Sequence, residues 1–360
     1  MAEFSEQVKA TTQDALIPKV VDNVLGSQVL AYRAIGNGKK WKGELLRKPI
    51  KVRNSNSATS FAGLDTFNAA QLDTKIRLSY DVRGVRQPVA LAGMDASVNG
   101  ASDDTQIIEL IVESLEETQQ ELVDYVGGLF YQTGTGNSNK DFLGAGALID
   151  DGTDVTTIGG QSRTTFPVLN ATRTASPVLS LTSLATLFSA VSSGTEMTKP
   201  TIMTSSEAVW DMYESLLTPT VREQYSMMGY YDMGLKGGPS RGAEGLKGTA
   251  GFVSLTYKGL GWVRDEKATT GNVFMHNERF NEWYGLKATP AMNYKPVSLG
   301  STQIEGVYGE AGLSDFTGFN WSGWNVPTNQ FGMVGEVNLL GNYVTWQPRR
   351  SGRLTGVAGV

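Results

Sequence analysis

The clearest pattern of hydrophobic and polar positions along the chain lies in residues 105–133. At about 100° per residue, ten apolar or aromatic side chains fall on one face of a helix and the acidic side chains fall on the other. The apolar positions are Ile107, Ile108, Ile111, Val112, Leu115, Leu122, Tyr125, Val126, Leu129 and Phe130. The spacing predicts an amphipathic α-helix of ~28 residues and ~42 Å, with capping candidates at 102–104 and an end before Gly134.

The charge of this predicted helix is one-sided. It carries six acids and no Lys or Arg, and the acids are Glu109, Glu113, Glu116, Glu117, Glu121 and Asp124. Like charges four residues apart each cost about 0.2–0.5 kcal/mol of helix stability. Two interpretations stay open, a solvated face that tolerates this repulsion or a basic surface of another segment or subunit that lies along it.

The first quarter of the chain predicts an arm followed by a hairpin. Residues 1–40 form the expected arm, with a short helix at 10–25 interrupted by Pro18 and a turn at 36–38. Polar and apolar residues then alternate at 49–53 and 74–82, which predicts two β-strands joined by a polar tip. Within that tip stand the apolar residues Phe61, Leu64 and Phe67. Such a hairpin is marginal alone in water, so we expect it to rest on another surface.

The rest of the chain mixes short strands, short helices and glycine-rich turns. Predicted helices lie at 180–193, with Ser180 or Thr182 as the cap, and from Ser205 or Ser206 to about 219. Predicted strands lie at 200–204, 252–255, 257–263 and 272–275, with at least one further strand pair at 333–346. A glycine-rich loop at 229–251 carries Tyr230 and Tyr231 near its start. The pattern predicts an α+β fold.

Composition narrows the class of protein. The chain has 360 residues, 40% hydrophobic content and no cysteine, which excludes disulfides and thiolate metal sites. No signal peptide and no membrane-spanning segment is predicted. The net charge of −5 is uneven, because residues 1–90 hold 14 Lys and Arg against 8 Asp and Glu, and the other residues hold 17 against 28. This split predicts that the basic first quarter of one subunit lies on the acidic remainder of its neighbour. The rival interpretation, nucleic-acid binding, lacks a dense basic run with interleaved aromatic residues.

Little catalytic chemistry is available. His276 is the only histidine, it follows an apolar run, and no GxSxG motif accompanies it, so a packed or edge-exposed histidine is favoured over a catalytic one. Asp150, Asp151 and Asp154 lack the spacing of a calcium loop and predict a turn. The glycine-rich loop does not contain a phosphate-binding motif. We therefore expect a structural protein, with no enzymatic activity, cofactor or metal.

Several segments resemble, in order and spacing, those of tailed-bacteriophage major capsid proteins. They are 60–65 (SFAGLD), 129–134 (LFYQTG), 200–204 (PTIMT), 210–219 (WDMYESLLTP) with Arg222, 257–266 (YKGLGWVRDE), 272–277 (NVFMHN), 335–342 (GEVNLLGN) and 348–354 (PRRSGRL). Each segment is short, but together they span most of the chain.

The resemblance implies an α+β capsid fold with five parts. These are an N-terminal arm (1–40), an extended β-hairpin loop (41–90), a peripheral domain (91–175) with a long spine helix (104–133), an axial domain with a central sheet flanked by helices (176–285), and a return segment that completes both sheets (286–360). In this family the hairpin loop lies across the peripheral domain of the neighbouring subunit.

The resemblance implies a major capsid protein that assembles into hexamers and pentamers of an icosahedral shell around double-stranded DNA, without sequence-specific DNA binding. Its place would be the virion, after assembly in the bacterial cytoplasm. Implied partners are other copies of the chain, a separate scaffolding protein, a portal and a decoration protein. A β-rich hydrolase or carbohydrate-binding domain is the alternative.

The charge split adds a hypothesis about the subunit contacts. Basic residues of the hairpin would meet the acidic helix of the neighbour, and apolar or aromatic residues of the two loops would add contacts. The expected contact residues are Lys42, Arg47, Lys48, Lys51, Arg53, Phe61, Leu64, Phe67, Glu109, Glu113, Glu117, Glu121, Tyr230 and Tyr231.

Overall fold

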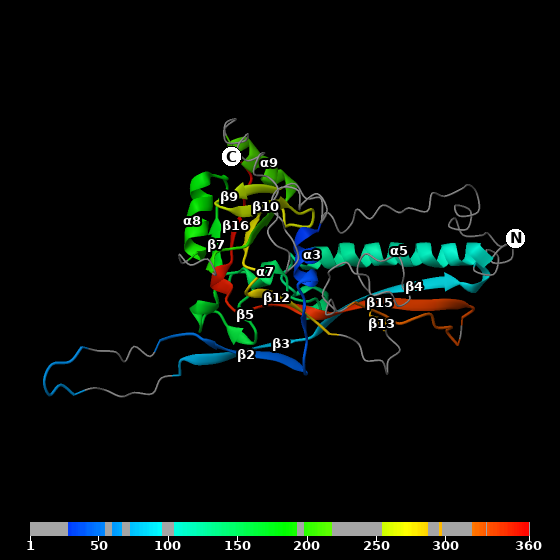
Figure 1. The fold of residues 1–360 in the computed structure, drawn as a ribbon, viewed down its shortest axis with the longest axis horizontal. Helices are drawn as coiled ribbons and strands as arrows, with labels where there is room; N and C mark the ends of the chain where they lie inside the picture. Colours follow the sequence, from blue (N-terminus) through cyan, green and yellow to red (C-terminus); the bar gives the residue numbers. More distant parts are fainter. Residues whose placement is uncertain are drawn as a thin grey trace, which may run out of the picture.

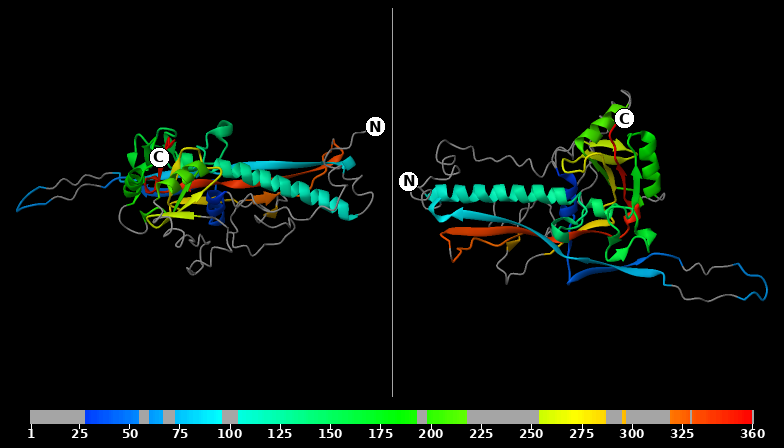
Figure 2. Two further views of the ribbon diagram at one scale, coloured as in Figure 1. Left: turned by 90° about the horizontal axis from the view of Figure 1, so that it is seen from above. Right: turned by 180° about the vertical axis from the view of Figure 1, so that it is seen from behind.

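The computed structural model describes an elongated α+β molecule (Figure 1). The described residues are 28–54, 60–66, 73–95, 104–192, 198–217, 254–286, 295–296, 319–328 and 330–359. Two six-stranded sheets form the body of the subunit. One sheet is drawn out into a long ribbon toward one end, and a two-stranded hairpin projects toward the opposite end (Figures 1 and 2).

The long sheet is organised by β15 (Gly332–Thr345), a strand of 14 residues. β4 (Arg83–Ala92) and β12 (Asn281–Gly285) pair with successive parts of β15, and β14 (Phe319–Trp321) pairs with its middle. β1 (Lys39–Lys40) and β13 (Lys295–Pro296) complete the sheet. The prediction of a strand pair at 333–346 is therefore wrong, because this segment is one continuous strand whose partners all come from elsewhere in the chain.

The predicted long helix is confirmed as α5 (Asp104–Leu129), which runs along the ribbon of β4 and β15 (Figure 1). Leu122, Val126 and Leu129 are buried, as the apolar face requires. Tyr125, assigned to the same face, is half exposed. The helix ends four residues before the predicted end, where the N–H groups of Tyr131 and Gln132 donate to the carbonyls three residues back, Gly128 and Leu129, at 3.1 Å instead of four residues back.

The second sheet is compact and lies beside the base of α5 (Figure 1). Its strand order is β7 (Thr172–Ala175), β16 (Gly352–Thr355), β11 (Val273–His276), β8 (Ile202–Ser205), β10 (Leu260–Arg264) and β9 (Ser254–Tyr257). The predicted helices are confirmed as α8 (Leu181–Val191) and α9 (Glu207–Leu216). Ser180 and Ser183 form a reciprocal capping box at the start of α8, which satisfies two otherwise unpaired helix N–H groups.

The two faces of the compact sheet have different partners. Met203, Trp262 and Met275 lie on the face that packs with the buried side chains of α8 and α9. Phe274 and His276 alternate with Met275, so they lie on the other face, toward the rest of the subunit. His276 is fully buried, and its Nε2 lies 3.0 Å from the Thr204 hydroxyl. The prediction of a packed histidine is confirmed.

An N-terminal helix, α3 (Val29–Gly36), packs against β12 and α5. The sequence pattern did not predict it, and the helix expected at 10–25 lies outside the described residues. Short elements complete the described chain: α6 (Gly136–Asn139), α7 (Ala145–Leu148), β5 (Thr157–Ile158), β6 (Gln161–Ser162), and the 3₁₀ turns η1 (Pro167–Leu169) and η5 (Pro348–Arg350). No helix in the described part of the chain is long and apolar enough to cross a lipid bilayer.

The predicted hairpin is confirmed. β2 (Leu45–Lys51) and β3 (Lys75–Asp81) pair as antiparallel strands from Leu45 opposite Asp81 to Lys51 opposite Lys75. The expected hairpin range of 41–90 also contains β4, which pairs with β15 in the long sheet instead. The chain therefore leaves the hairpin at Val82 and enters the ribbon one residue later.

Candidate assembly surfaces

The register of the hairpin divides its side chains between two faces. Directly opposed residues share a face in an antiparallel pair, and successive residues alternate. One face therefore carries four exposed cations, Arg47, Lys51, Lys75 and Arg77, which we call the basic hairpin face. Within the described residues, no carboxylate forms an ion pair with any of these four side chains.

One pair on the basic hairpin face is unfavourable by itself. Lys51 lies directly opposite Lys75, and like charges in that position destabilise a sheet. Pro49 and the flanking Lys and Arg residues on β2 also match the way exposed edge strands are protected from unwanted pairing. Both strands of this two-stranded hairpin are edges, so edge protection accounts for cations on each strand but not for the placement of Lys51 directly opposite Lys75. The arrangement favours a partner surface that is acidic.

The other face of the hairpin is fixed to its own subunit. Leu46 and Ile50 pack against the core, and the hydroxyl of Tyr80 donates to the carbonyl of Thr345 at 2.7 Å. Lys48 lies on this face, with its ammonium 4.8 Å from the centre of the Trp346 ring, a favourable cation–π contact. The structure thus separates Lys48 from the other predicted cations.

The tip of the hairpin presents two apolar side chains to solvent. Phe61 is 81% exposed and Leu64 is 100% exposed. Between them the chain forms a turn, in which the Ala62 N–H donates to the Asp65 carboxylate at 2.8 Å and the Asp65 N–H donates to the Ala62 carbonyl at 3.3 Å. Gly63 adopts φ +61°, a conformation that suits glycine. The turn is therefore ordered locally while its apolar side chains have no contact to bury them.

The acidic side of α5 is described from its middle onward. Glu117 and Glu121 are exposed, and the amide of Gln87 donates to Glu121 at 2.6 Å. Asp124 pairs with the Lys267 ammonium at 2.7 Å. Glu109 and Glu113 lie on α5, but their side chains are outside the described part. Among the described acids of α5, Glu121 and Asp124 therefore have polar partners in the same chain, and both lie in the C-terminal part of the helix.

Within one subunit, the predicted basic and acidic residues do not meet. The hairpin projects toward one end of the molecule and α5 runs toward the other, in both views of Figure 2. Lys42 is exposed in the loop before β2, and the Arg53 guanidinium donates to the Asp73 carbonyl at 2.7 Å. Phe67, Tyr230 and Tyr231 lie outside the described residues. Lys75 and Arg77 were missed, although pairing the two predicted strands in register would have found them.

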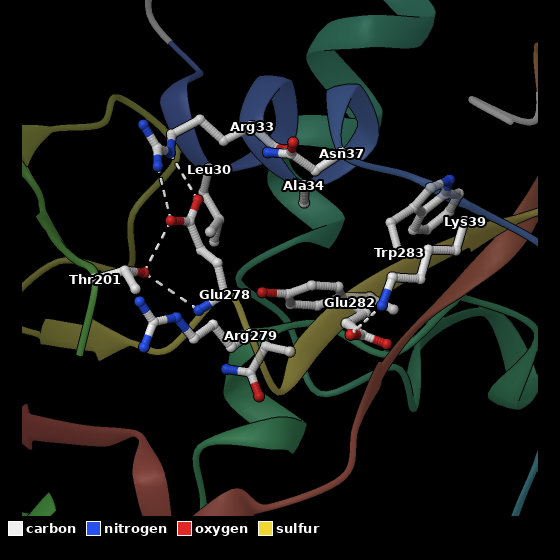
Figure 3. Close-up of a pocket in the computed structure, with 12 residues that line it drawn as sticks. Leu30, Arg33, Ala34, Asn37, Lys39, Thr201, Glu278, Arg279, Glu282 and Trp283 are labelled. Atoms are coloured by element: carbon white, nitrogen blue, oxygen red, sulfur yellow. Dashed lines mark hydrogen bonds and ion pairs between the residues drawn. The ribbon is translucent and has the colours of Figure 1, made fainter. Parts of the chain in front are cut away.

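A cavity of about 430 Å³ lies between α3, β12 and the start of β8 (Figure 3). Its charged side chains face one another. The Arg33 guanidinium binds Glu278 through two contacts of 2.6 and 2.7 Å, the Thr201 hydroxyl donates to the same carboxylate at 2.8 Å, and Lys39 pairs with Glu282 across the cavity. Burial raises the pKa of Glu278, but the hydrogen bond and charge of Arg33 outweigh it and hold that pKa below its usual value. Glu278 and Glu282 are therefore both engaged in ion pairs that connect the N-terminal segment to the strands beside it.

The turn predicted at residues 150–154 is confirmed. Asp150 accepts the N–H groups of Gly152, Asp154 and Val155 at 2.9–3.1 Å. Its side chain is fully buried, and three arginines also reach it: Arg163, Arg173 and Arg353. These partners were missed because they lie far apart in the sequence, and they make this cluster an ionic joint between the loop and the compact sheet.

Comparisons with known proteins identify the fold. No protein-family model and no curated protein matches the sequence. The capsid asymmetric unit of cyanophage A-1(L) aligns over 97% of this chain and 96% of its own, with a TM-score of 0.65 and 9% identity. The capsid of Myoviridae phage XM1 aligns over 96% of this chain and 97% of its own, with a TM-score of 0.52 and 12% identity.

A third solved structure is an encapsulin complex. The holo-SrpI encapsulin complex from Synechococcus elongatus aligns over 99% of this chain and 96% of its own, with a TM-score of 0.54 and 10% identity. The chain therefore has the α+β fold of phage capsid proteins, and the fold that the sequence resemblance implied is confirmed. The same fold also occurs in an encapsulin complex.

Proposed function

We propose that this protein is the structural subunit of an icosahedral shell, the major capsid protein of a tailed bacteriophage. The observation that carries the proposal is the end-to-end match with the cyanophage capsid subunit, which leaves almost no part of either chain unmatched. An added catalytic domain would break such a match. The hydrolase or carbohydrate-binding alternative is not favoured, since the compared structures are shells and the carboxylates in the cavity are held in ion pairs.

The shape and charge of the molecule support the proposed self-association. The hairpin projects from one end with a basic face and an apolar tip, while the acidic side of α5 lies toward the other end (Figure 2). A contact between two different surfaces of identical subunits is head-to-tail, and it gives closed rings when the rotation between subunits closes. Hexamers and pentamers are such rings. The hairpin of each subunit would lie on α5 of the next one.

The proposed contents are double-stranded DNA, held without sequence-specific contacts. The chain has a net charge of −5, and a strongly basic lining would instead bind the DNA backbone and oppose its movement during packaging. The proposed location is the virion, after assembly in the host cytoplasm. A separate scaffolding protein, a portal and a decoration protein are the expected partners, and the residue ranges of the arm, hairpin loop and domains stay predictions.

The test is electron microscopy of the overexpressed full chain beside a variant without the hairpin tip. Removing residues 1–90 would also remove α3 and part of β4, so it would damage the body of the subunit. The better variant joins Val52 to Thr74 through an Asn-Gly turn, because these two residues lie opposite each other and the Val52 N–H already donates to the Thr74 carbonyl. Shells or capsomers from the full chain, and folded monomers from the variant, are expected. Normal shells from the tipless variant would contradict the proposed hairpin contact.

An assembly like the encapsulin complex is the second candidate, because that complex aligns over 99% of this chain. The contents of particles purified from the natural source distinguish the two. Nuclease-resistant double-stranded DNA inside the particles is expected. Particles that enclose a defined protein and no DNA would support the second candidate instead.

A further inference from the structure

Asp265 is a buried carboxylate at the start of the N-terminal helix α3. Asp265 is 1% exposed, and its carboxylate accepts three hydrogen bonds from neutral donors. The N–H of Leu30, in the first turn of α3, donates at 3.1 Å; the hydroxyl of Tyr131 donates at 2.9 Å; and the N–H of Lys267 donates at 3.1 Å. Asp265 therefore joins α3 to the end of α5 and to the loop after β10.

The cations around Asp265 are engaged with other acids. The Lys267 ammonium pairs with Asp124 on α5, Arg264 pairs with Glu207 on α9, and Arg33 on α3 pairs with Glu278. Within the described residues, no ion pair reaches the Asp265 carboxylate. Glu266, exposed and adjacent, adds a second negative charge that opposes ionisation. A buried anion held only by neutral donors is costly compared with the same group in water.

A chain of hydroxyl groups behind Asp265 can accept its neutral form. Tyr131 also forms a side-chain hydrogen bond with Thr204, and the Thr204 hydroxyl lies 3.0 Å from the Nε2 of His276. When Asp265 is ionised, the Tyr131 hydroxyl donates to it. When Asp265 is protonated, its O–H donates to the Tyr131 oxygen, Tyr131 donates to Thr204, and Thr204 donates to the neutral histidine. The contacts from Asp265 to Tyr131, Thr204 and the Nε2 of His276 therefore each have a donor and an acceptor, while the buried Nδ1 of His276 has no partner within the described residues.

From this geometry we propose that Asp265 is a proton-linked switch for the docking of helix α3. The neutral carboxyl holds α3 in place, and the buried carboxylate weakens that docking and makes the N-terminal helix easier to release. The wall of the Asp265 site is formed in part by α3 itself, whose Val29 packs with Ile202 and Val263. Release of α3 would therefore return the carboxylate to water.

The direction of the pH effect follows from the difference between the buried carboxyl group in the docked state and the hydrated one after release of α3. Burial is the main cause that raises the pKa of Asp265 above its usual value, and the three hydrogen bonds only partly offset it. A group whose pKa is raised in the docked state binds its proton more tightly there. Docking of α3 is therefore strongest below the ordinary pKa of an aspartate, and it weakens as the pH rises through the raised pKa. The docking constant would fall by at most about tenfold per pH unit across that window.

The test measures hydrogen exchange of the amides in residues 29–36 in the full chain, as protection factors at several pH values. In the wild type, protection is expected to fall as the pH rises through the Asp265 window. Asp265→Asn removes the charge: with its oxygen at the position of Oδ2 it still accepts from the Leu30 N–H and the Tyr131 hydroxyl, and only the hydrogen bond from the Lys267 N–H to Oδ1 is lost. This variant should give higher protection at neutral pH with no dependence on pH. Asp211→Asn, at an exposed position on α9, is the matched control and should behave as the wild type.

Infrared spectroscopy gives a second readout that does not depend on the stability of the variant. The difference spectrum of wild type minus Asp265→Asn should contain a protonated carboxyl band that titrates above the range of exposed aspartates. Two results would overturn the proposal. One is an Asp265 band that titrates in the ordinary range, and the other is wild-type protection of α3 that does not change with pH.

Discussion

Arg353 on β16 and Asp150, 203 residues earlier in the chain, are joined in the interior of the subunit. The Arg353 Nη2 lies 2.7 Å from Asp150 Oδ1, and Arg163 and Arg173 reach the same carboxylate at 3.1 and 3.4 Å. Arg163 is itself buried and also donates to the carbonyls of Ala147 and Val155. One carboxylate therefore holds together a loop and two strands of the compact sheet.

Neutralising this carboxylate should destabilise the subunit strongly. Asp150→Asn leaves Arg163 buried without its counter-charge, and breaking a buried ion pair in this way costs about 3–5 kcal/mol of folding free energy. The measurement is urea unfolding of the unassembled subunit. Asp151→Asn is the control, since Asp151 is partly exposed and lies 3.9 Å from Arg173, and it should change stability by less than about 1 kcal/mol. Equal effects of the two variants would contradict the assigned role of Asp150.

The apolar hairpin tip should matter for assembly and not for folding. Leu64→Ser removes a side chain that is fully exposed in the subunit, so its unfolding free energy should change by less than about 0.5 kcal/mol. If sedimentation then shows that the Leu64→Ser chain forms no particles, the effect lies at a contact between subunits. Leu78→Ser, at a buried position on β3, is the contrasting variant and should unfold the subunit. A Leu64→Ser chain that assembles at the wild-type concentration would count against the tip contact.

Exchanging charges tests the proposed contact between the hairpin and α5. Reversal of Glu113, Glu117 and Glu121 to Lys should block assembly while the monomer stays folded, because the helix face would then repel the basic hairpin face. Reversal of Lys51, Lys75 and Arg77 to Glu should have the same result. A chain that carries both sets of changes should regain particles, as seen by electron microscopy. Normal shells from the helix variant alone would rule out this charge pairing.

His276 predicts an acid-sensitive loss of stability. Burial lowers the pKa of His276 from 6.5 to about 4, so the folded state favours the neutral ring. Its contribution is therefore present above pH 6.5 and is lost as the pH falls toward 4, by about 3 kcal/mol in all. Unfolding free energies from pH 7 to 4 should fall less in His276→Gln than in the wild type. This direction is opposite to that of Asp265, so the two residues can be told apart in one pH series.

Local patterns were enough to predict several elements. The 3.6-residue period gave α5, Ser180 marked the start of α8, and the two-residue period gave both strands of the hairpin. The ordered segments that resemble capsid proteins pointed to the fold now found. Each of these signals lies within one stretch of chain, where backbone geometry alone fixes which side chains share a face.

Long-range packing decided the rest. Residues 333–346 form one strand because β4, β12 and β14 reach it from three distant segments. The basic hairpin face exists only in the register that places Lys51 opposite Lys75. Asp150 and Asp265 look alike in the sequence, yet one is surrounded by three arginines and the other by neutral donors. The sequence by itself determined the local elements and the charge of each segment. Only the tertiary structure decided which charges are buried and what faces them, because burial and pairing depend on chain segments that no local period connects.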